Sequence, residues 1–217
     1  PALQTGHCVA DNNIVHKGGR LYPGCCGLWI GHSGQNELTH NDVSDLYYTG
    51  ISVGWNWGYS ESPAVDNRIE YNHVHDIGQG VLSDMGGIYT LGISPGTVIR
   101  NNVFHDVYSY DRYGRGGWGL YNDQASSHII MENNLIYNTK TGGYHLHFGR
   151  DLTIRNNIFV NSMDNQLQRS RIEDHFQFTF ANNIVYWDEG NLFRGRWEAD
   201  GIEMRDNLYW KGSGEEI

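Results

Sequence analysis

A six-residue phrase with asparagine at its fourth position recurs along the chain. The phrases read VADNNI, LTHNDV, IEYNHV, IRNNVF, MENNLI, IRNNIF, FANNIV and MRDNLY, in that order. A repeat of this length is typical of a solenoid, in which each repeat stacks only on its neighbours. The shared asparagines lie 23 to 32 residues apart and are Asn12, Asn41, Asn72, Asn102, Asn134, Asn157, Asn183 and Asn207.

The pattern around each asparagine predicts β-strands rather than helices. Apolar residues alternate with a period of two, and the chain contains 28 glycines, whereas helical repeats are rich in Leu and Ala. Asparagine tolerates left-handed backbone and bonds local backbone groups, so we expect it to turn each corner. Stacked asparagines can also form an amide ladder along the axis. We therefore predict an all-β fold, a single-stranded right-handed parallel β-helix of about eight coils.

We expect this β-helix to form one domain over residues 1–217. The chain begins without Met, in what reads as the middle of a repeat. The expectation is therefore that coils on its N-terminal side are missing.

A second strand follows each corner, in the segments GISVGW, GIYTLG, GLYNDQ, GYHLHF, QLQRSR and LFRGRW. Because side chains alternate along a strand, the second residue should face the core and the third and fifth should face outwards. A slip of one residue would exchange the two faces. The inward column is Ile51, Ile88, Leu120, Tyr144, Leu167 and Phe193. The third-position column is Ser52, Tyr89, Tyr121, His145, Gln168 and Arg194, and the fifth-position column is Gly54, Leu91, Asp123, His147, Ser170 and Arg196.

The outward columns gather Tyr, His, Asp and Arg on one face. Neighbours in a column lie ~4.8 Å apart, so Asp123 should reach His147. A solvated face normally carries Thr, Ser and Lys, and we interpret this strip as a functional site. The alternative is a polar ladder that only satisfies its own hydrogen bonds.

The middle repeats are about six residues longer than the late ones, and the extra residues must leave the rod as loops. They carry aromatic, glycine-rich segments at residues 54–62, 82–87 and 108–119. Aromatic rings pack against the apolar faces of sugars. We expect these loops to wall a carbohydrate groove, the alternative being that they only cover the rod.

Composition and charge limit the kinds of partner that the sequence predicts. The formal net charge of −10 disfavours nucleic acid, and no apolar run is long enough to predict a membrane partner. Cys8, Cys25 and Cys26 lack zinc-ligand spacing, and no Asp-rich calcium cluster is visible, so we expect no metal and no cofactor. Exposed coil edges would permit oligomerisation through the ends of the helix.

Several blocks in a fixed order resemble the β-helix of glycoside hydrolase family 141. They are ISVGWNWG, LSDMGGIYTLG, GTVIRNNVFHDV, GLYNDQASSHIIMENNLIYNT, GGYHLHFG and QLQRSR, and the match runs from about Leu46 to Trp197. Family members are longer, so the chain is similar to the C-terminal part of their helix. The resemblance implies a secreted or periplasmic enzyme that hydrolyses plant or microbial glycans, such as xylan-like or fucosylated ones, with two carboxylates.

The resemblance places these carboxylates at Asp84 and Asp123. The second block departs from the family pattern YLDEG, because Gln124 and Ala125 replace its acidic residue and its glycine. A neighbouring histidine should favour the charged form of Asp123, and aromatic neighbours should make Asp84 the less solvated acid. The residues expected to bind sugar are Trp55, Trp57, Tyr89, Tyr121, His145, His147, Gln168, Arg169, Arg171 and Trp197.

Two other functions stay open from the sequence. A polysaccharide lyase would abstract a proton with a base, for which Arg169, Arg171 and His147 are candidates. A non-catalytic carbohydrate-binding rod, as in adhesins or phage tailspikes, would need no such group. The uneven distribution of chemistry along the outward columns favours the hydrolase.

Overall fold

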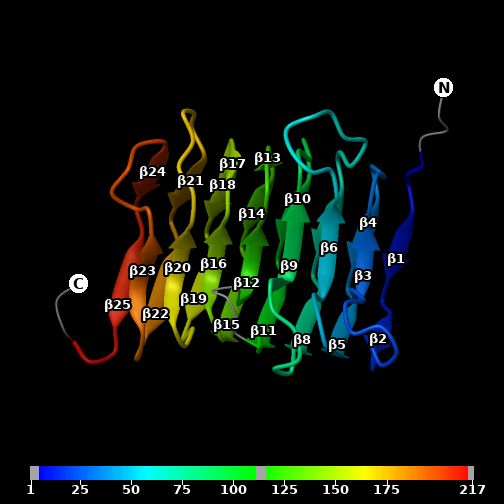
Figure 1. Ribbon diagram of the computed structural model, residues 1–217, viewed down its shortest axis with the longest axis horizontal. Coiled ribbons are helices and arrows are strands. Elements are labelled where there is room, and N and C mark those ends of the chain that lie inside the picture. The colour runs from blue at the N-terminus through cyan, green and yellow to red at the C-terminus, as the bar shows by residue number, and fades with distance from the viewer. Residues whose placement is uncertain (1–4, 111–115, 215–217) are drawn as a thin grey trace.

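The computed structural model describes residues 5–110 and 116–214, which wind into an elongated stack of coils with the termini at opposite ends (Figure 1). A full coil contributes one strand to each of three parallel sheets, and the first and second sheets each have eight strands while the third has seven. The predicted parallel β-helix of about eight coils is therefore confirmed.

The strands are short, and corresponding strands pair in register from coil to coil. The first sheet consists of β1 (Val9–Asp11), β4 (Glu37–Thr39), β7 (Arg68–Glu70), β10 (Val98–Arg100), β14 (Ile130–Glu132), β18 (Leu152–Arg155), β21 (Phe178–Ala181) and β24 (Ile202–Arg205). The second consists of β2 (Ile14–His16), β5 (Asp42–Leu46), β8 (His73–Ile77), β11 (Val103–Val107), β15 (Leu135–Thr139), β19 (Ile158–Val160), β22 (Ile184–Trp187) and β25 (Leu208–Lys211). The third consists of β3 (Leu28–Ile30), β6 (Ile51–Gly54), β9 (Met85–Leu91), β12 (Gly117–Asn122), β16 (Gly142–Leu146), β20 (Asn165–Arg169) and β23 (Asn191–Gly195), and a separate pair joins β13 (Ser126–Ser127) to β17 (Gly149–Arg150).

The predicted asparagine ladder lies at the corner between the first and second sheets. The Oδ1 atom of each ladder asparagine accepts hydrogen bonds from both the backbone N–H and the side-chain Nδ2 of the ladder asparagine one coil earlier. At Asn102 and Asn134 both distances are 3.0 Å. The Nδ2 of Asn102 also donates to the carbonyl of Ile69, in the coil directly before it, at 2.9 Å. Because Asn102 is only 1% exposed, the ladder satisfies polar groups that water cannot reach.

Two details of the predicted corner are wrong. The left-handed residue is the one before each ladder asparagine, with φ of 57° at Asn101 rather than at Asn102. In the first coil the ladder begins at Asn13, not Asn12, because Ala10 pairs with Leu38 and shifts the phrase by one residue. Asn12 instead takes the left-handed position, with φ of 57°.

A second, shorter ladder was missed by the sequence analysis. The Oδ1 of Asn36 accepts from the backbone N–H of Cys8 at 3.1 Å, and the Oδ1 of Asn67 accepts from the side chain of Asn36 at 2.8 Å. The hydroxyl of Thr97 replaces the amide in the next coil, accepting from the N–H of Asn67 at 3.3 Å. A different residue type at this rung breaks the sequence repeat, which is why the pattern did not predict it.

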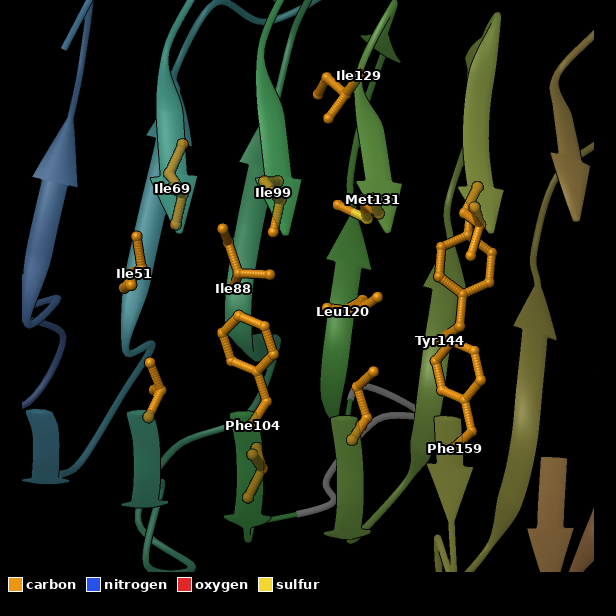
Figure 2. Packing of buried hydrophobic residues seen from close by; sticks show 14 of the residues in the cluster. Ile51, Ile69, Ile88, Ile99, Phe104, Leu120, Ile129, Met131, Tyr144 and Phe159 are labelled. Atoms are coloured by element: carbon orange, nitrogen blue, oxygen red, sulfur yellow. The ribbon is translucent and has the colours of Figure 1, made fainter. Parts of the chain in front are cut away.

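The interior is a continuous apolar column. Figure 2 shows Ile51, Ile88, Leu120 and Tyr144 lined up in successive coils of the third sheet, and all four are fully buried. Their pairing confirms the predicted register of this sheet. Phe193 continues the column but is 39% exposed, because β23 is the last strand of the third sheet in the described part of the chain.

The longer middle coils give loops that differ in extent from the predicted ones. The loop between β6 and β7 covers residues 55–67, and the loop between β8 and β9 covers residues 78–84. The predicted segments 82–87 and 108–119 each end inside a strand, since β9 begins at Met85 and β12 at Gly117. Residues 111–115 of the last segment lie outside the described residues.

Within the described parts of the chain, no helix is long and apolar enough to cross a membrane.

Candidate active site

A pocket of about 330 Å³ opens on the outer face of the third sheet. Strands β9, β12, β16 and β20, from four successive coils, form its floor, and residues directly before or after these strands complete its wall together with Trp57 of the loop after β6. Because the coils stack in register, residues far apart in sequence meet there. The lining residues are Trp57, Asp84, Tyr89, Trp118, Tyr121, Asp123, Gln124, His145, His147, Gln168 and Ser170.

The floor is the third-position column expected from the sequence. Tyr89 pairs with Tyr121, Tyr121 with His145, and His145 with Gln168. The ring of His145 is stacked on that of Tyr121, with 4.7 Å between centroids. The register therefore did not slip, and the outward column is continuous across four coils.

Two carboxyl groups enter the pocket, each held by a tyrosine hydroxyl. Asp123 follows β12, is 6% exposed, and accepts a short hydrogen bond from the hydroxyl of Tyr89. Asp84 lies directly before β9 with a left-handed φ of 63°, and its Oδ1 accepts from the hydroxyl of Tyr121 at 3.0 Å. Tyr48 donates to the backbone carbonyl of Asp84 at 2.8 Å. The loop thus brings Asp84 beside the outward column of the next coil.

Burial raises the pKa of Asp123, and the negative charge of Asp84 raises it further, while the bond from Tyr89 and the proximity of His147 oppose the shift. His147 favours the charged form of Asp123, as expected, but burial outweighs it. The expectation that Asp84 is the less solvated acid is wrong, because Asp123 is the more buried of the two. Asp84 is only partly buried. Asp123 is therefore the carboxyl better suited to carry a proton.

The tyrosines that hold these carboxyls are fixed as donors. Burial, followed by the charges of Asp123 and Asp84, raises the pKa of Tyr121 far above its usual range. Burial and Asp123 likewise raise the pKa of Tyr89. Both hydroxyls therefore stay protonated at any pH at which the protein would work.

His145 is a neutral member of the floor. It is 3% exposed, and burial lowers its pKa well below the usual value. Its Nε2 lies 2.7 Å from the hydroxyl of Ser170. The indole of Trp118 packs 4.1 Å from the His145 ring and donates to Gln168 Oε1 at 3.1 Å. These contacts orient the polar end of the pocket.

Arg169, which was expected to bind sugar, faces the interior of the helix. It follows Gln168 in β20, so alternation directs it to the opposite side. Its side chain is 0% exposed, and its guanidinium donates to Gln177 and to the carbonyl of Arg196 at 2.8 Å. The expectation that it contacts a ligand is therefore corrected.

Three other expected sugar contacts do not line the pocket. Trp55 packs behind Tyr89, with 6.3 Å between ring centroids. Arg171 lies over the ring of Phe148, 4.7 Å from its centroid. Trp197 packs against the rings at the C-terminal end of the core. The expected residues that do line it are Trp57, Tyr89, Tyr121, His145, His147 and Gln168, together with Asp84 and Asp123.

Trp118, Gln124 and Ser170 line the pocket but were not selected from the sequence. Trp118 lies in register with Gly86 and Gly142, and a side chain at Gly142 would lie 3.0 Å from its indole. A large aromatic residue flanked by glycines in neighbouring repeats was the available signal.

The right-handed β-helix region family matches residues 2–190, so the chain belongs to this family. The predicted right-handed turn of the helix is thereby confirmed. No curated protein matches the chain.

Solved structures with the same fold come from several kinds of protein. A glycoside hydrolase is 20% identical with a TM-score of 0.59, covering 94% of this chain and 26% of its own. A tailspike double mutant of E. coli bacteriophage HK620, in complex with a pentasaccharide, is 13% identical with a TM-score of 0.65, covering 95% of this chain and 38% of its own. PfbA, a surface adhesin of Streptococcus pneumoniae, is 11% identical with a TM-score of 0.50, covering 90% and 59%. The chain thus spans well under half the length of the glycoside hydrolase and of the tailspike.

Proposed function

We propose that this chain is a glycoside hydrolase that uses Asp84 and Asp123 as its two carboxylates. The observation that carries the proposal is that these two side chains, from different coils, enter one pocket and are each held by a tyrosine of the outward column. Hydrolysis of a glycosidic bond needs one carboxyl to protonate the leaving oxygen and a second to act at the anomeric carbon.

The difference in burial assigns a role to each carboxyl. Asp123, with its raised pKa, holds the proton and transfers it to the glycosidic oxygen as the bond to the anomeric carbon breaks. Asp84, which is more solvated, attacks the anomeric carbon or removes a proton from the attacking water. Gln168, at the polar end of the pocket, orients the sugar.

The pocket favours neutral sugars. The carboxylate of Asp84 repels a uronate, and the ring of Trp57 offers a surface for the apolar face of a pyranose. Trp57 is 61% exposed at the pocket wall. The resemblance to glycoside hydrolase family 141 and the shared fold with a solved glycoside hydrolase support the same class of reaction.

The test is to incubate the untagged chain with a panel of neutral and acidic glycans and to characterise the products. We expect new reducing ends without the unsaturated ends that absorb in the ultraviolet. Unsaturated ends would instead identify a lyase and would contradict the proposal.

A carbohydrate-binding rod is the second candidate function. It is favoured by the fold shared with a tailspike whose structure contains a pentasaccharide and with a surface adhesin. Glycan binding by the parent with no product in any assay would establish it in place of hydrolysis.

The pH profile gives a prediction for Tyr89. Its hydroxyl favours the charged form of Asp123, so Tyr89→Phe should raise the pKa of Asp123. The alkaline limb, where the acid loses its proton, should then move to higher pH. Turnover measured against pH for parent and variant checks this, with Tyr137→Phe on the second sheet as the control. An alkaline limb that stays in place or moves to lower pH would contradict the role of Asp123 as the acid.

A further inference from the structure

Three histidines gather on the outer face of the second sheet, away from the pocket of the third. His73 and His75 lie on β8, and His105 lies one coil further on β11, paired with His75. One ring nitrogen from each of the three lies within 4.8 Å of the others. The rings of His75 and His105 are nearly parallel, with centroids 5.1 Å apart. Stacking along the register thus places three imidazoles in one small volume.

A carboxylate holds the Nδ1 atom of each ring. His73 Nδ1 lies 3.1 Å from Asp42. In the other two cases the partner is the next residue in the chain: His75 Nδ1 lies 2.7 Å from Asp76, and His105 Nδ1 lies 2.6 Å from Asp106. A carboxylate accepts hydrogen bonds, so each Nδ1 carries its proton and, in the neutral ring, each Nε2 presents a lone pair.

This assignment creates a conflict that a cation would resolve. The Nε2 atoms of His73 and His105 face each other at 2.8 Å, and two lone pairs at that distance repel. The Nε2 of His75 also lies 3.4 Å from an Asp42 oxygen. A positive centre between these atoms would be bound by nitrogen and oxygen donors at once.

We propose that His73, His75 and His105 bind a divalent transition metal of the Zn²⁺ type, with Asp42 as a fourth donor or as the hydrogen-bond partner of a ligand. Neutral imidazole and carboxylate are the ligands such ions prefer. In a tetrahedral Zn²⁺ site the donors lie about 3.3 Å apart, which small ring rotations reach from the observed spacing. Histidine ligands held by carboxylates at the second nitrogen are the usual arrangement in metal sites.

The sequence expectation of no metal rested on cysteine spacing and on the lack of an Asp-rich cluster. The histidine ligands come from two coils and the fourth donor from a third, so no contiguous motif contains them. The repeated HD pair, at residues 75–76 and 105–106, was the available signal once the two phrases are aligned.

The experiment is to remove metal from the untagged chain with a chelator, add Zn²⁺, desalt and measure bound metal. We expect one tightly bound Zn²⁺ per chain in the parent and none in the His75→Gln, His105→Gln double variant. His40→Gln is the matched control, because His40 forms the same kind of bond to a carboxylate, at 2.8 Å from Asp11, outside the cluster. That variant should bind Zn²⁺ as the parent does.

A graded variant and a spectrum keep the test independent of folding. Asp106→Asn retains all three imidazoles and should weaken Zn²⁺ binding about 10- to 100-fold. Co²⁺ added to the parent should give visible absorption bands that the double variant lacks, while circular dichroism verifies that both are folded. Equal retention of metal by parent and double variant, or none by either, would overturn the proposal and leave the rings as a stacking ladder only.

Discussion

The Asp123→Asn variant is expected to lose about 10²- to 10⁴-fold in turnover while still binding glycan, because the amide keeps the shape of the pocket but cannot transfer a proton. Asp84→Asn should lose at least as much, since it removes the group that acts at the anomeric carbon. Steady-state turnover and glycan affinity of parent and variants check both. Asp151→Asn, an exposed aspartate outside the pocket, should leave both quantities unchanged.

The two roles are separated by the leaving group. In an aryl glycoside with an acidic phenol, the phenolate leaves without being protonated. Asp123→Asn should therefore recover much of its activity on that substrate, and Asp84→Asn should not. Recovery by the Asp84 variant alone would reverse the assignment drawn from burial. Turnover of the double variant at the parental rate would remove both residues from the mechanism.

The Asn102→Leu variant is expected to lower the free energy of unfolding by about 3 to 5 kcal/mol, because several buried groups lose their partners together. Asn72 would lose the acceptor for its N–H and Nδ2, at 2.8 and 3.0 Å. The carbonyl of Ile69 would lose its donor. Urea unfolding followed by circular dichroism measures the change.

Asn13→Leu is the matched control for the ladder. Asn13 is the first rung and is exposed, so water can replace most of its bonds and the loss should be well under 1 kcal/mol. Equal stability of Asn102→Leu and the parent would mean that the ladder does not hold the coils together.

The fold was predictable because every coil of a parallel β-helix uses the same corner hydrogen bonds and the same inward-facing apolar positions. The ladder asparagines and the inward column recur at the coil period, so one alignment places both Asn102 and Leu120. The same register correctly set Tyr121 beside His145. Where the repeat is interrupted, as by Thr97 in the second ladder, the sequence did not predict the ladder.

The site was predictable only in part, since its chemistry depends on burial and on loops. Strand alternation placed Asp123 outward, but it could not show that Asp123 is more buried than Asp84. The approach of Asp84 depends on a loop that ends with a left-handed residue, which no repeat specifies. Alternation does direct Arg169 inward, and selecting it as a ligand contact from the motif QLQRSR overlooked that rule.

The most direct test of the carboxylate mechanism is hydrolysis of a neutral oligosaccharide in water enriched in oxygen-18, with products analysed by mass spectrometry. Hydrolysis incorporates one solvent oxygen into the product that carries the new reducing end. We predict labelled, saturated products from the parent and none from the Asp84→Asn, Asp123→Asn double variant. Unlabelled unsaturated products from the parent, or equal labelling by the double variant, would contradict the account.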